Sequence, residues 1–279
     1  MKGKMALAEI KRTLEKPRSV EEWIIQIKSN WENIPEFKVD TQKLKHLAII
    51  CDGNRRAAKE IRLNPFLGHQ AGIEVVRLAS MACRQWDIHA LTFWLRSTEN
   101  WQRDKMQVEF IMNLFKKTLQ NPEFLNELCE SQVNFKHLGR KDRFSKAIRG
   151  GLETWEKKTA HFSRYQLNVA LDYGGEDEIA RSLIKISQEI KQNHLLVEKL
   201  AKNPKLIWQF LDTKNQHAVD LIIRTGTKSD EIPHTSGFMP LQSAYACWSF
   251  IPDLFPNLTP NSILKPIEEF QKYQRRFGK

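Results

Sequence analysis

From residue 46 onward, short runs of apolar residues alternate with longer segments in which apolar residues recur every three or four positions. The short runs are typical of strands buried on both faces of a parallel sheet, and the longer segments are typical of amphipathic helices. Strands are predicted at 46–52, 89–95, 134–139, 165–175 and 218–226, and helices at 72–86, 105–121, 142–159, 176–193 and 266–278. This alternation predicts an α/β fold, a single domain with a central, mainly parallel β-sheet flanked by helices.

The first 45 residues follow a different pattern. Ser19 precedes a segment that begins with acidic residues and has apolar residues at Trp23, Ile24, Ile27 and Trp31. Serine is a favoured helix N-cap, and this spacing places the apolar residues on one helix face. We therefore predict a helical N-terminal extension over 1–45 with a packing role, ahead of the main domain at 46–279.

The composition is that of an ordinary globular protein, with 41% hydrophobic and 28% charged residues. A chain with this balance can bury a core and is not expected to be disordered throughout. The N-terminus has no apolar segment like that of a secretory signal, and no apolar run approaches the roughly 20 residues of a membrane span. The four cysteines are too widely spaced for a metal knuckle or a dense disulfide framework. We therefore expect a cytoplasmic protein with free thiols.

The charge of the chain limits the class of partner. A formal net charge of +11 favours nucleic acid, an anionic membrane surface or small anionic substrates. The basic residues are dispersed, with no run of five. A nucleic-acid partner is therefore not expected, because such proteins usually concentrate their positive charge.

Polar clusters follow four of the predicted strands, at 51–56, 96–103, 172–177 and 224–231. The carboxyl ends of parallel strands meet at one edge of a sheet, and ligands bind beyond that edge. One polar strand end is an ordinary loop, whereas four on one edge predict a site.

The first cluster has the chemistry of a site for a metal-bound diphosphate. Asp-Gly and Gly-Asn are also common in turns, but the residues after Asn54 are polar and helix-prone, so a hairpin is not expected. Asp52 could bind Mg²⁺, which takes few carboxylates together with phosphate oxygens. Gly53 allows backbone amides to approach a phosphate. Guanidinium groups bind phosphate oxygens, and the candidates are Arg55, Arg56 and Arg62.

Five ordered motifs resemble those of the cis-prenyltransferases, the undecaprenyl diphosphate synthase family. They are HLAIICDGNRR followed by GHQAG, ALTFWLRSTENWQR, LNVALDYGG, DLIIRTG with SGF and QSAYA, and QRRFG. The resemblance covers about residues 46–278, which identifies 46–279 as a cis-prenyltransferase-like catalytic domain of a divergent member. It implies a homodimer that adds isopentenyl diphosphate to an allylic diphosphate and forms a new cis double bond with the help of Mg²⁺.

The resemblance also implies roles for individual residues. Asp52 resembles the aspartate that holds Mg²⁺ with a diphosphate, and Arg224 and Ser236 resemble residues that bind isopentenyl diphosphate. The catalytic candidates are Asp52, Asn54, Ser97 and Glu99. The substrate-binding candidates are Gly53, Arg56, His69, Asn100, Trp101, Arg103, Arg224, His234 and Ser236, with Arg55 and Arg62 added for their phosphate-binding chemistry.

An apolar prenyl tail needs a cavity that excludes water. The helices predicted at 72–86 and 105–121 are the candidates for its wall. The candidate wall residues are Met81, Phe110, Ile111, Leu114 and Phe115, although for any one of them a place in the ordinary core is the stronger expectation.

The chain departs from the family pattern at four places. Ala57 stands where tryptophan is usual, and Pro65 where arginine is usual. The segment 224–238 is about four residues longer, with His234 at the position of a second arginine. Cys247 stands where a glutamate helps to hold magnesium at the dimer interface, and cysteine is a poor magnesium ligand. The metal is then held mainly by Asp52 and substrate oxygens, or an acid of the longer segment, Asp230 or Glu231, takes the place of the glutamate.

We therefore predict a Mg²⁺-dependent prenyltransferase that makes a cis-polyprenyl diphosphate, with peripheral membrane contact for a lipid product. Two alternatives stay open: an atypical member that joins or cyclises short prenyl diphosphates, and a non-catalytic subunit of a prenyltransferase complex. The chain has no phosphate-binding loop of nucleotide hydrolases and no dinucleotide-binding glycine motif. It also has no Asp-Asp pair, which excludes the aspartate-rich metal motif of trans-prenyltransferases.

Overall fold

A sheet of six parallel strands forms the middle layer of the computed structural model, which describes residues 16–192 and 197–272. The strands are ordered β3-β4-β2-β1-β5-β6 across the sheet. Their bounds are β1 His46–Ile50, β2 Ala90–Ser97, β3 Val133–Leu138, β4 Tyr165–Tyr173, β5 Leu221–Arg224 and β6 Cys247–Phe250. The prediction of an α/β fold around a mainly parallel sheet is confirmed.

Five of these strands lie where the apolar runs predict them, and β6 is the strand that the sequence analysis missed. β6 is only four residues long and lies at the edge of the sheet, where all four residues are half-buried. A short edge strand lacks the continuous apolar run that marks a central parallel strand.

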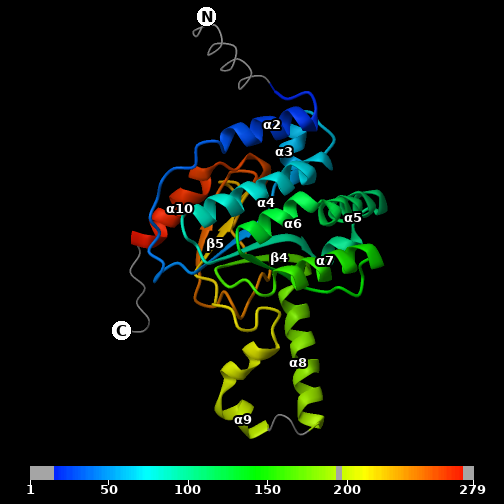
Figure 1. The fold of residues 1–279 in the computed structure, drawn as a ribbon, viewed down its shortest axis with the longest axis vertical. Coiled ribbons are helices and arrows are strands. Elements are labelled where there is room, and N and C mark those ends of the chain that lie inside the picture. The colour runs from blue at the N-terminus through cyan, green and yellow to red at the C-terminus, as the bar shows by residue number, and fades with distance from the viewer. Residues whose placement is uncertain (1–15, 193–196, 273–279) are drawn as a thin grey trace, which may run out of the picture.

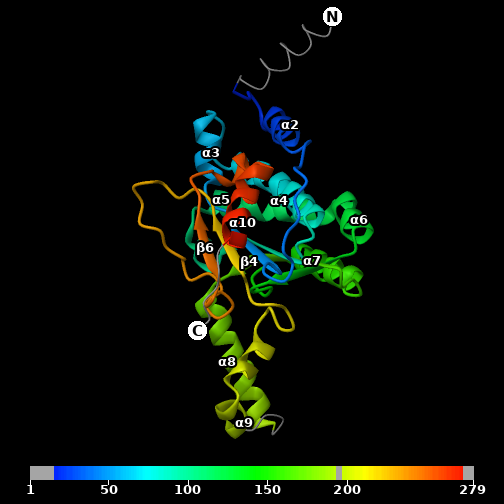
Figure 2. The ribbon, with the colours of Figure 1, turned by 90° about the vertical axis from the view of Figure 1, so that its left-hand side faces the viewer.

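Along the described chain, helices pack mainly on one face of the sheet (Figures 1 and 2). Their bounds are α2 Val20–Asn30, α3 Asn54–Glu60, α4 Leu67–Gln85, α5 Lys105–Gln120, α6 Pro122–Glu130, α7 Lys146–Thr159, α8 Gly175–Lys191, α9 Val197–Lys202 and α10 Pro260–Lys272. Short 3₁₀ helices are η1 Thr98–Gln102, η2 Pro204–Phe210 and η3 Phe255–Asn257. α8 extends away from the sheet toward α9, as both views show (Figures 1 and 2).

Two predicted helices begin earlier than the apolar pattern indicates. α4 begins at Leu67, directly after a turn in which the Asn64 side chain accepts a hydrogen bond from the Phe66 amide and the Asn64 carbonyl accepts one from the Leu67 amide. α10 begins at Pro260 rather than at 266. At this start, Thr259 and Ser262 exchange hydrogen bonds in a capping arrangement. The predicted continuation of this helix over 273–278 lies outside the described residues.

The main core lies on one face of the sheet and the second, smaller core lies on the other. α4, α6, α7 and α10 supply buried residues to the main core (Figure 1). The second face is covered by fewer apolar side chains, among them Phe238 and Met239. The main core therefore carries the larger share of the apolar burial that stabilises the fold.

The predicted N-terminal helix is present as α2, and the Ser19 side chain caps it as expected. Trp23, Ile27 and Trp31 are buried in the main core, and the Trp31 indole donates a hydrogen bond of 2.9 Å to the Leu258 carbonyl. The division of the chain at residue 45 stays a prediction, but the described part of the extension packs on the same core as the sheet. Among the described residues, no helix combines the length and the apolar character that crossing a membrane requires.

Candidate active site

β1, β2 and β5 end at the same edge of the sheet, because they are parallel and Ile50 lies beside both Trp94 and Arg224. A cavity of about 450 Å³ lies beyond this edge, and we call it the polar cavity. Twelve of the predicted site residues line it: Asp52, Gly53, Asn54, Arg55, Arg56, His69, Ser97, Glu99, Asn100, Arg103, Arg224 and Ser236. The fold thus brings together residues from three of the four polar strand ends.

Asp52 lies at the centre of these contacts. Its Oδ1 accepts a hydrogen bond of 2.6 Å from the Gly53 amide and lies 3.4 Å from Arg56 Nη2. Its Oδ2 lies 3.3 Å from Arg224 Nη2. Gly53 has a φ of 99°, a left-handed conformation that favours glycine and that turns the chain from β1 into α3. The carboxylate is 43% exposed, so it can reach a ligand in the cavity.

The starts of α3 and α4 are packed against each other with almost no free space. The buried Asn54 donates a hydrogen bond of 2.8 Å to the Cys51 carbonyl. A Cβ atom at Gly68 would lie 1.9 Å from the Asn54 backbone oxygen, and one at Gly72 would lie 2.5 Å from its side-chain oxygen. Glycine at these two positions therefore permits the approach that brings His69 to the polar cavity.

His69 is held in its neutral form. Burial above all, together with the positive charges of Arg103, Arg55 and Arg96, lowers its pKa to about 4. Its Nε2 atom is buried and has no hydrogen-bond partner among the described residues. A neutral imidazole at this point can exchange a hydrogen bond with a ligand oxygen without adding a charge.

Arg224 links the loop after β5 to Asp52. Its Nη1 donates hydrogen bonds of 2.8 Å to the His234 carbonyl and 2.8 Å to Ser236 Oγ. Its side chain is 10% exposed. His234 does not itself line the cavity but accepts a hydrogen bond from Arg224 through its carbonyl, and its contact with substrate stays a prediction.

The segment after β2 turns over the cavity as the 3₁₀ helix η1. Asn100 donates a hydrogen bond of 2.8 Å to Ser97 Oγ, and Thr98 donates one of 2.7 Å to Glu99. Burial would raise the pKa of Glu99, but hydrogen bonds from Thr98, its own backbone and Ser97, with the charge of Arg143, lower it overall. Glu99 is therefore an ionised carboxylate at the rim of the cavity near pH 7.

Two further predicted site residues do not line the polar cavity. Trp101 packs on Phe144, with ring centroids 6.1 Å apart, and lies under Arg96, whose Cζ is 4.8 Å from the indole centroid. Arg62 follows the end of α3 as an exposed residue with a φ of 62°. α3 ends before Arg62, and the Trp101 ring packs against the core, so direct contact of these residues with substrate stays a prediction.

The sequence analysis missed Arg96 as a site residue. Arg96 is the penultimate residue of β2, is 2% exposed and lines the polar cavity. The sequence feature that could have indicated it is a charged residue directly after the apolar run at 89–95, in the same motif as Ser97 and Glu99. Arg143 pairs with the fully buried Asp172, and its Cζ lies 5.5 Å from the centroid of the Trp101 ring.

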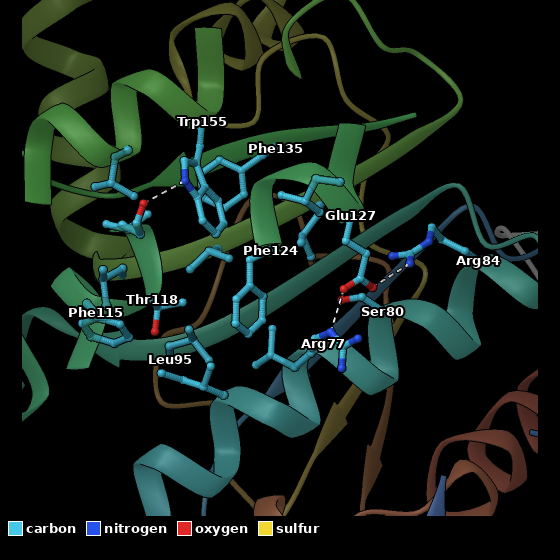
Figure 3. A pocket seen from close by; sticks show the side chains of 18 residues that line it. Arg77, Ser80, Arg84, Leu95, Phe115, Thr118, Phe124, Glu127, Phe135 and Trp155 are labelled. Carbon is cyan, nitrogen blue, oxygen red and sulfur yellow. Dashed lines mark hydrogen bonds and ion pairs between the residues drawn. The ribbon is translucent and has the colours of Figure 1, made fainter. Parts of the chain in front are cut away.

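A second cavity, of about 90 Å³, lies between α4, α5, α6, α7 and the sheet, and we call it the apolar cavity (Figure 3). Its wall includes Phe115, Phe124, Phe135 and Trp155 (Figure 3). Leu95 lines both this cavity and the polar cavity. The apolar space therefore begins where the polar cavity ends.

A small cavity of about 20 Å³ bridges the two along α4. His69 and Asn54 belong to it and to the polar cavity, and Ile73 and Phe115 belong to it and to the apolar cavity. Of the predicted wall residues, Phe115 lines the apolar cavity and Leu114 the bridging one. Met81, Phe110 and Ile111 line neither of these cavities, so for them the structure favours the expectation of an ordinary packing position.

Known proteins resemble this chain over most of its length. The family model described as "Putative undecaprenyl diphosphate synthase" matches residues 50–278. The isoprenyl transferase of Wolinella succinogenes is 35% identical over 242 residues, which cover 86% of this chain and 98% of that protein. The tritrans,polycis-undecaprenyl-diphosphate synthase (geranylgeranyl-diphosphate specific) of Thermococcus kodakarensis is 35% identical over 235 residues, covering 84% of this chain and 87% of that protein. The chain belongs to the cis-prenyltransferase family.

Solved structures of similar proteins agree with this assignment. The lavandulyl diphosphate synthase from Lavandula x intermedia, in complex with dimethylallyl diphosphate, superposes with a TM-score of 0.77 at 26% identity and covers 86% of this chain and 100% of its own. A "probable undecaprenyl diphosphate synthase" from Campylobacter jejuni has a TM-score of 0.66 at 30% identity, covering 85% of this chain and 99% of its own. The predicted cis-prenyltransferase fold and the prediction of an enzyme that transfers prenyl groups are confirmed.

Asp52 of this cis-prenyltransferase fits the Mg²⁺ that the family resemblance implies. Its half-exposed carboxylate faces the cavity in which five arginines could hold phosphate groups. Within the described residues, no three His, Cys, Asp or Glu side chains group together as a metal site. One carboxylate is still enough for Mg²⁺, because this ion takes most of its ligands from substrate phosphates and water.

The cysteine at the position of the family glutamate lies far from Asp52 of the same cis-prenyltransferase chain. The strand register places Cys247 beside Leu221, at the amino end of β5, whereas Asp52 follows the carboxyl end of β1. Asp230 and Glu231 instead line an open cleft of about 540 Å³ together with Asp52, Arg56 and Lys228. Within one chain, the acids of the longer loop therefore lie nearer to Asp52 than residue 247 does, and both accounts of the missing acid stay predictions.

Proposed function

We propose that this enzyme condenses isopentenyl diphosphate with an allylic diphosphate, with Mg²⁺ held by Asp52, to give a cis-polyprenyl diphosphate. The observation that carries the proposal is the continuity of the polar and apolar cavities through Leu95. A prenyl diphosphate has a polyanionic head and an apolar tail, so it needs both kinds of space side by side.

The residues of the polar cavity supply charge where the reaction needs it. When the allylic diphosphate ionises, negative charge develops on the leaving group, and the guanidinium groups of Arg55, Arg56 and Arg103 stabilise that charge. Bound Mg²⁺ would add its own charge to the same oxygens. Arg224 and Ser236 hold the second diphosphate on the other side of Asp52.

The apolar cavity supports a short prenyl tail as the first occupant. One water-sized group needs roughly 10–15 Å³ of such a volume. The cavity of about 90 Å³ therefore has room for one to two five-carbon units before side chains must move. Phe124 and Trp155 belong to the wall that a longer tail would have to displace.

Product analysis tests this function. The enzyme is incubated with radiolabelled isopentenyl diphosphate, Mg²⁺ and a panel of allylic primers, and the products are sized by chromatography. Chains longer than the primer are expected with wild type, and none with Asp52→Asn. Absence of any elongated product with every primer would contradict the proposal.

A second function, the joining or cyclising of short prenyl diphosphates, is favoured by two observations. Arg224 is engaged by a loop that carries His234 where the family has arginine, which alters the isopentenyl diphosphate side of the cavity. The lavandulyl diphosphate synthase, solved with dimethylallyl diphosphate, has a TM-score of 0.77, against 0.66 for the Campylobacter jejuni protein. Incubation with dimethylallyl diphosphate alone, followed by NMR of the product, distinguishes the two functions, because elongation needs isopentenyl diphosphate as well.

We infer that the longer loop contributes an acid to the metal site. Asp230 and Glu231 share an open cleft with Asp52, whereas Cys247 does not. Asp230→Ala and Glu231→Ala should then raise the Mg²⁺ concentration for half-maximal rate about three- to tenfold, and Cys247→Glu should leave it unchanged. The reverse pattern in a Mg²⁺ titration would return the role to the position of Cys247.

We also propose that the enzyme works as a homodimer. β6 leaves a half-exposed strand at the sheet edge, where Trp248 and Phe250 stack with ring centroids 5.8 Å apart. Tyr245, just before it, is 81% exposed. Light scattering should give a molar mass in solution that is twice the mass of the chain. Phe250→Lys should lower this measured mass toward that of a monomer. Peripheral membrane contact stays a prediction that vesicle flotation would test.

A further inference from the structure

Arg96 enters the polar cavity because β2 is irregular at that point. Trp94 pairs with Ala170, Arg96 with Leu171 and Ser97 with Tyr173, so the register against β4 shifts on both sides of Arg96. Such a bulge breaks the alternation of a strand and re-aims a side chain. As a result, Leu95 and Arg96, which are neighbours in sequence, both line the polar cavity.

The Arg96 guanidinium is only partly satisfied by the protein. Its Nη2 donates a hydrogen bond of 2.9 Å to the Asn100 carbonyl, and its Cζ lies over Trp101. Its Nε and Nη1 are buried and have no hydrogen-bond partner among the described residues. It forms no ion pair with the described residues, and the nearby carboxylate of Asp172 is bound by Arg143.

The surroundings of Arg96 leave its charge uncompensated. Burial above all, together with the charges of Arg103 and Arg143 and against the opposing charge of Asp172, lowers its pKa to about 10. The group is therefore still protonated at pH 7. A buried cation with free donors destabilises a protein unless an anion approaches it.

We propose that Arg96 binds substrate directly, with Nε and Nη1 donating to diphosphate oxygens on the side of the polar cavity formed by His69 and Arg103. This role rests on the proposed function and adds a residue to its binding site. Two neighbours support the position: the unpartnered His69 Nε2 and the Arg103 guanidinium line the same cavity. Nη2 meanwhile keeps η1 in place through Asn100, so one guanidinium joins the turn over the cavity to the substrate.

The test compares binding with stability in Arg96→Met and Arg96→Lys. Methionine keeps an unbranched apolar body over Trp101 and removes the charge, and lysine keeps the charge without the planar donors. Arg149→Met is the matched control, because it removes the same charge from an exposed position on α7. The dissociation constant of inorganic pyrophosphate is measured by calorimetry in the presence of Mg²⁺, and melting temperatures are measured without ligand.

The expected result is a dissociation constant at least tenfold higher in Arg96→Met, several-fold higher in Arg96→Lys and unchanged in Arg149→Met. The melting temperature of Arg96→Met without ligand should equal or exceed that of wild type, because an uncompensated buried charge is gone. A pyrophosphate affinity equal to wild type in the folded Arg96 variants would overturn the inference, since a merely structural arginine affects melting and not binding. If Arg96→Met does not fold, the pyrophosphate dissociation constant of Arg96→Lys, compared with that of wild type, tests the inference in the same way.

This outcome is separable from a failure of the proposed function. Wild type that binds pyrophosphate through Arg96 but elongates no primer would contradict the proposed function and leave the assignment of Arg96 standing. Wild type that elongates primers, with Arg96 variants that bind pyrophosphate as it does, would contradict the assignment alone.

Discussion

The two walls of the polar cavity are built in different ways. The wall formed by residues 52–72 is close-packed, with Gly68 and Gly72 pressed against Asn54. The wall formed by residues 227–237 is an exposed loop, in which a Cβ at Gly237 would meet no atom within 4 Å. We conclude that the first wall has a fixed geometry, whereas the second can change in length and composition without disturbing the core.

Asp52 belongs to the first wall and contacts Arg224, which binds His234 and Ser236 of the second wall, so its replacement should have the largest effect. Asp52→Asn should lower turnover about a thousandfold or more, equivalent to about 4 kcal/mol, because the metal and both arginines lose their shared carboxylate. Stability should barely change, because the side chain is half-exposed. Steady-state kinetics and thermal melting measure the two effects, with the exposed Asp142→Asn as control. Full activity in a folded Asp52→Asn enzyme would exclude a metal role for this residue.

Arg56 and Arg224, which contact the two oxygens of the Asp52 carboxylate, should separate the two substrates. Arg224→Gln should weaken binding of isopentenyl diphosphate by roughly 2–4 kcal/mol, through loss of a charge-assisted contact, and affect the allylic diphosphate less. Arg56→Gln should show the opposite preference, because Arg56 lies on the first wall. Dissociation constants for both diphosphates, measured on both variants, give the comparison. Equal losses of affinity for the two substrates would mean that the two walls do not bind different diphosphates.

Added methyl groups should distinguish the walls by stability. Gly68→Ala places a Cβ against a backbone oxygen, so we expect a loss of about 3 kcal/mol from overpacking. Gly237→Ala costs about 1 kcal/mol, from the left-handed φ of 69° alone. These losses correspond to falls in melting temperature of roughly 6–12 °C and 2–4 °C. Similar falls for the two variants would refute the contrast in packing.

Acid should weaken the first wall through His69. Its pKa is lowered to about 4 from the usual 6.5, so between these values the unfolded chain binds a proton that the folded chain does not. The contribution of neutral His69 to the free energy of unfolding is therefore fully present above pH 6.5 and is lost as the pH falls toward 4. From pH 6.5 to 5, wild type should lose about 1–2 kcal/mol more than His69→Gln in urea unfolding. Identical pH slopes would show that His69 takes up a proton without penalty.

The strand–helix alternation could be predicted from the sequence because each central strand is buried on both faces and each large helix has one apolar face. The ends of elements could not, because they depend on local hydrogen bonds such as those of the turn at Asn64 before α4. The loop over 227–237 has no period, so its contact with Arg224 was out of reach of sequence analysis, although the resemblance named both Arg224 and Ser236. Arg96 was missed because a β-bulge leaves no trace in an alternating pattern.

The apolar cavity also bears on how product leaves the enzyme. Ion pairs of Glu127 with Arg77, at 2.6 Å, and with Arg84, at 3.4 Å, lie across the end of the cavity away from Leu95 (Figure 3). A tail that occupies this space therefore withdraws through the polar cavity, and each five-carbon unit that enters water on the way costs about 4 kcal/mol. Dissociation should slow steeply with each added unit. The rate of steady-state turnover then depends on whether the released tail enters water or an apolar phase. Detergent micelles or lipid vesicles should therefore accelerate multiple turnover and leave the first turnover unchanged.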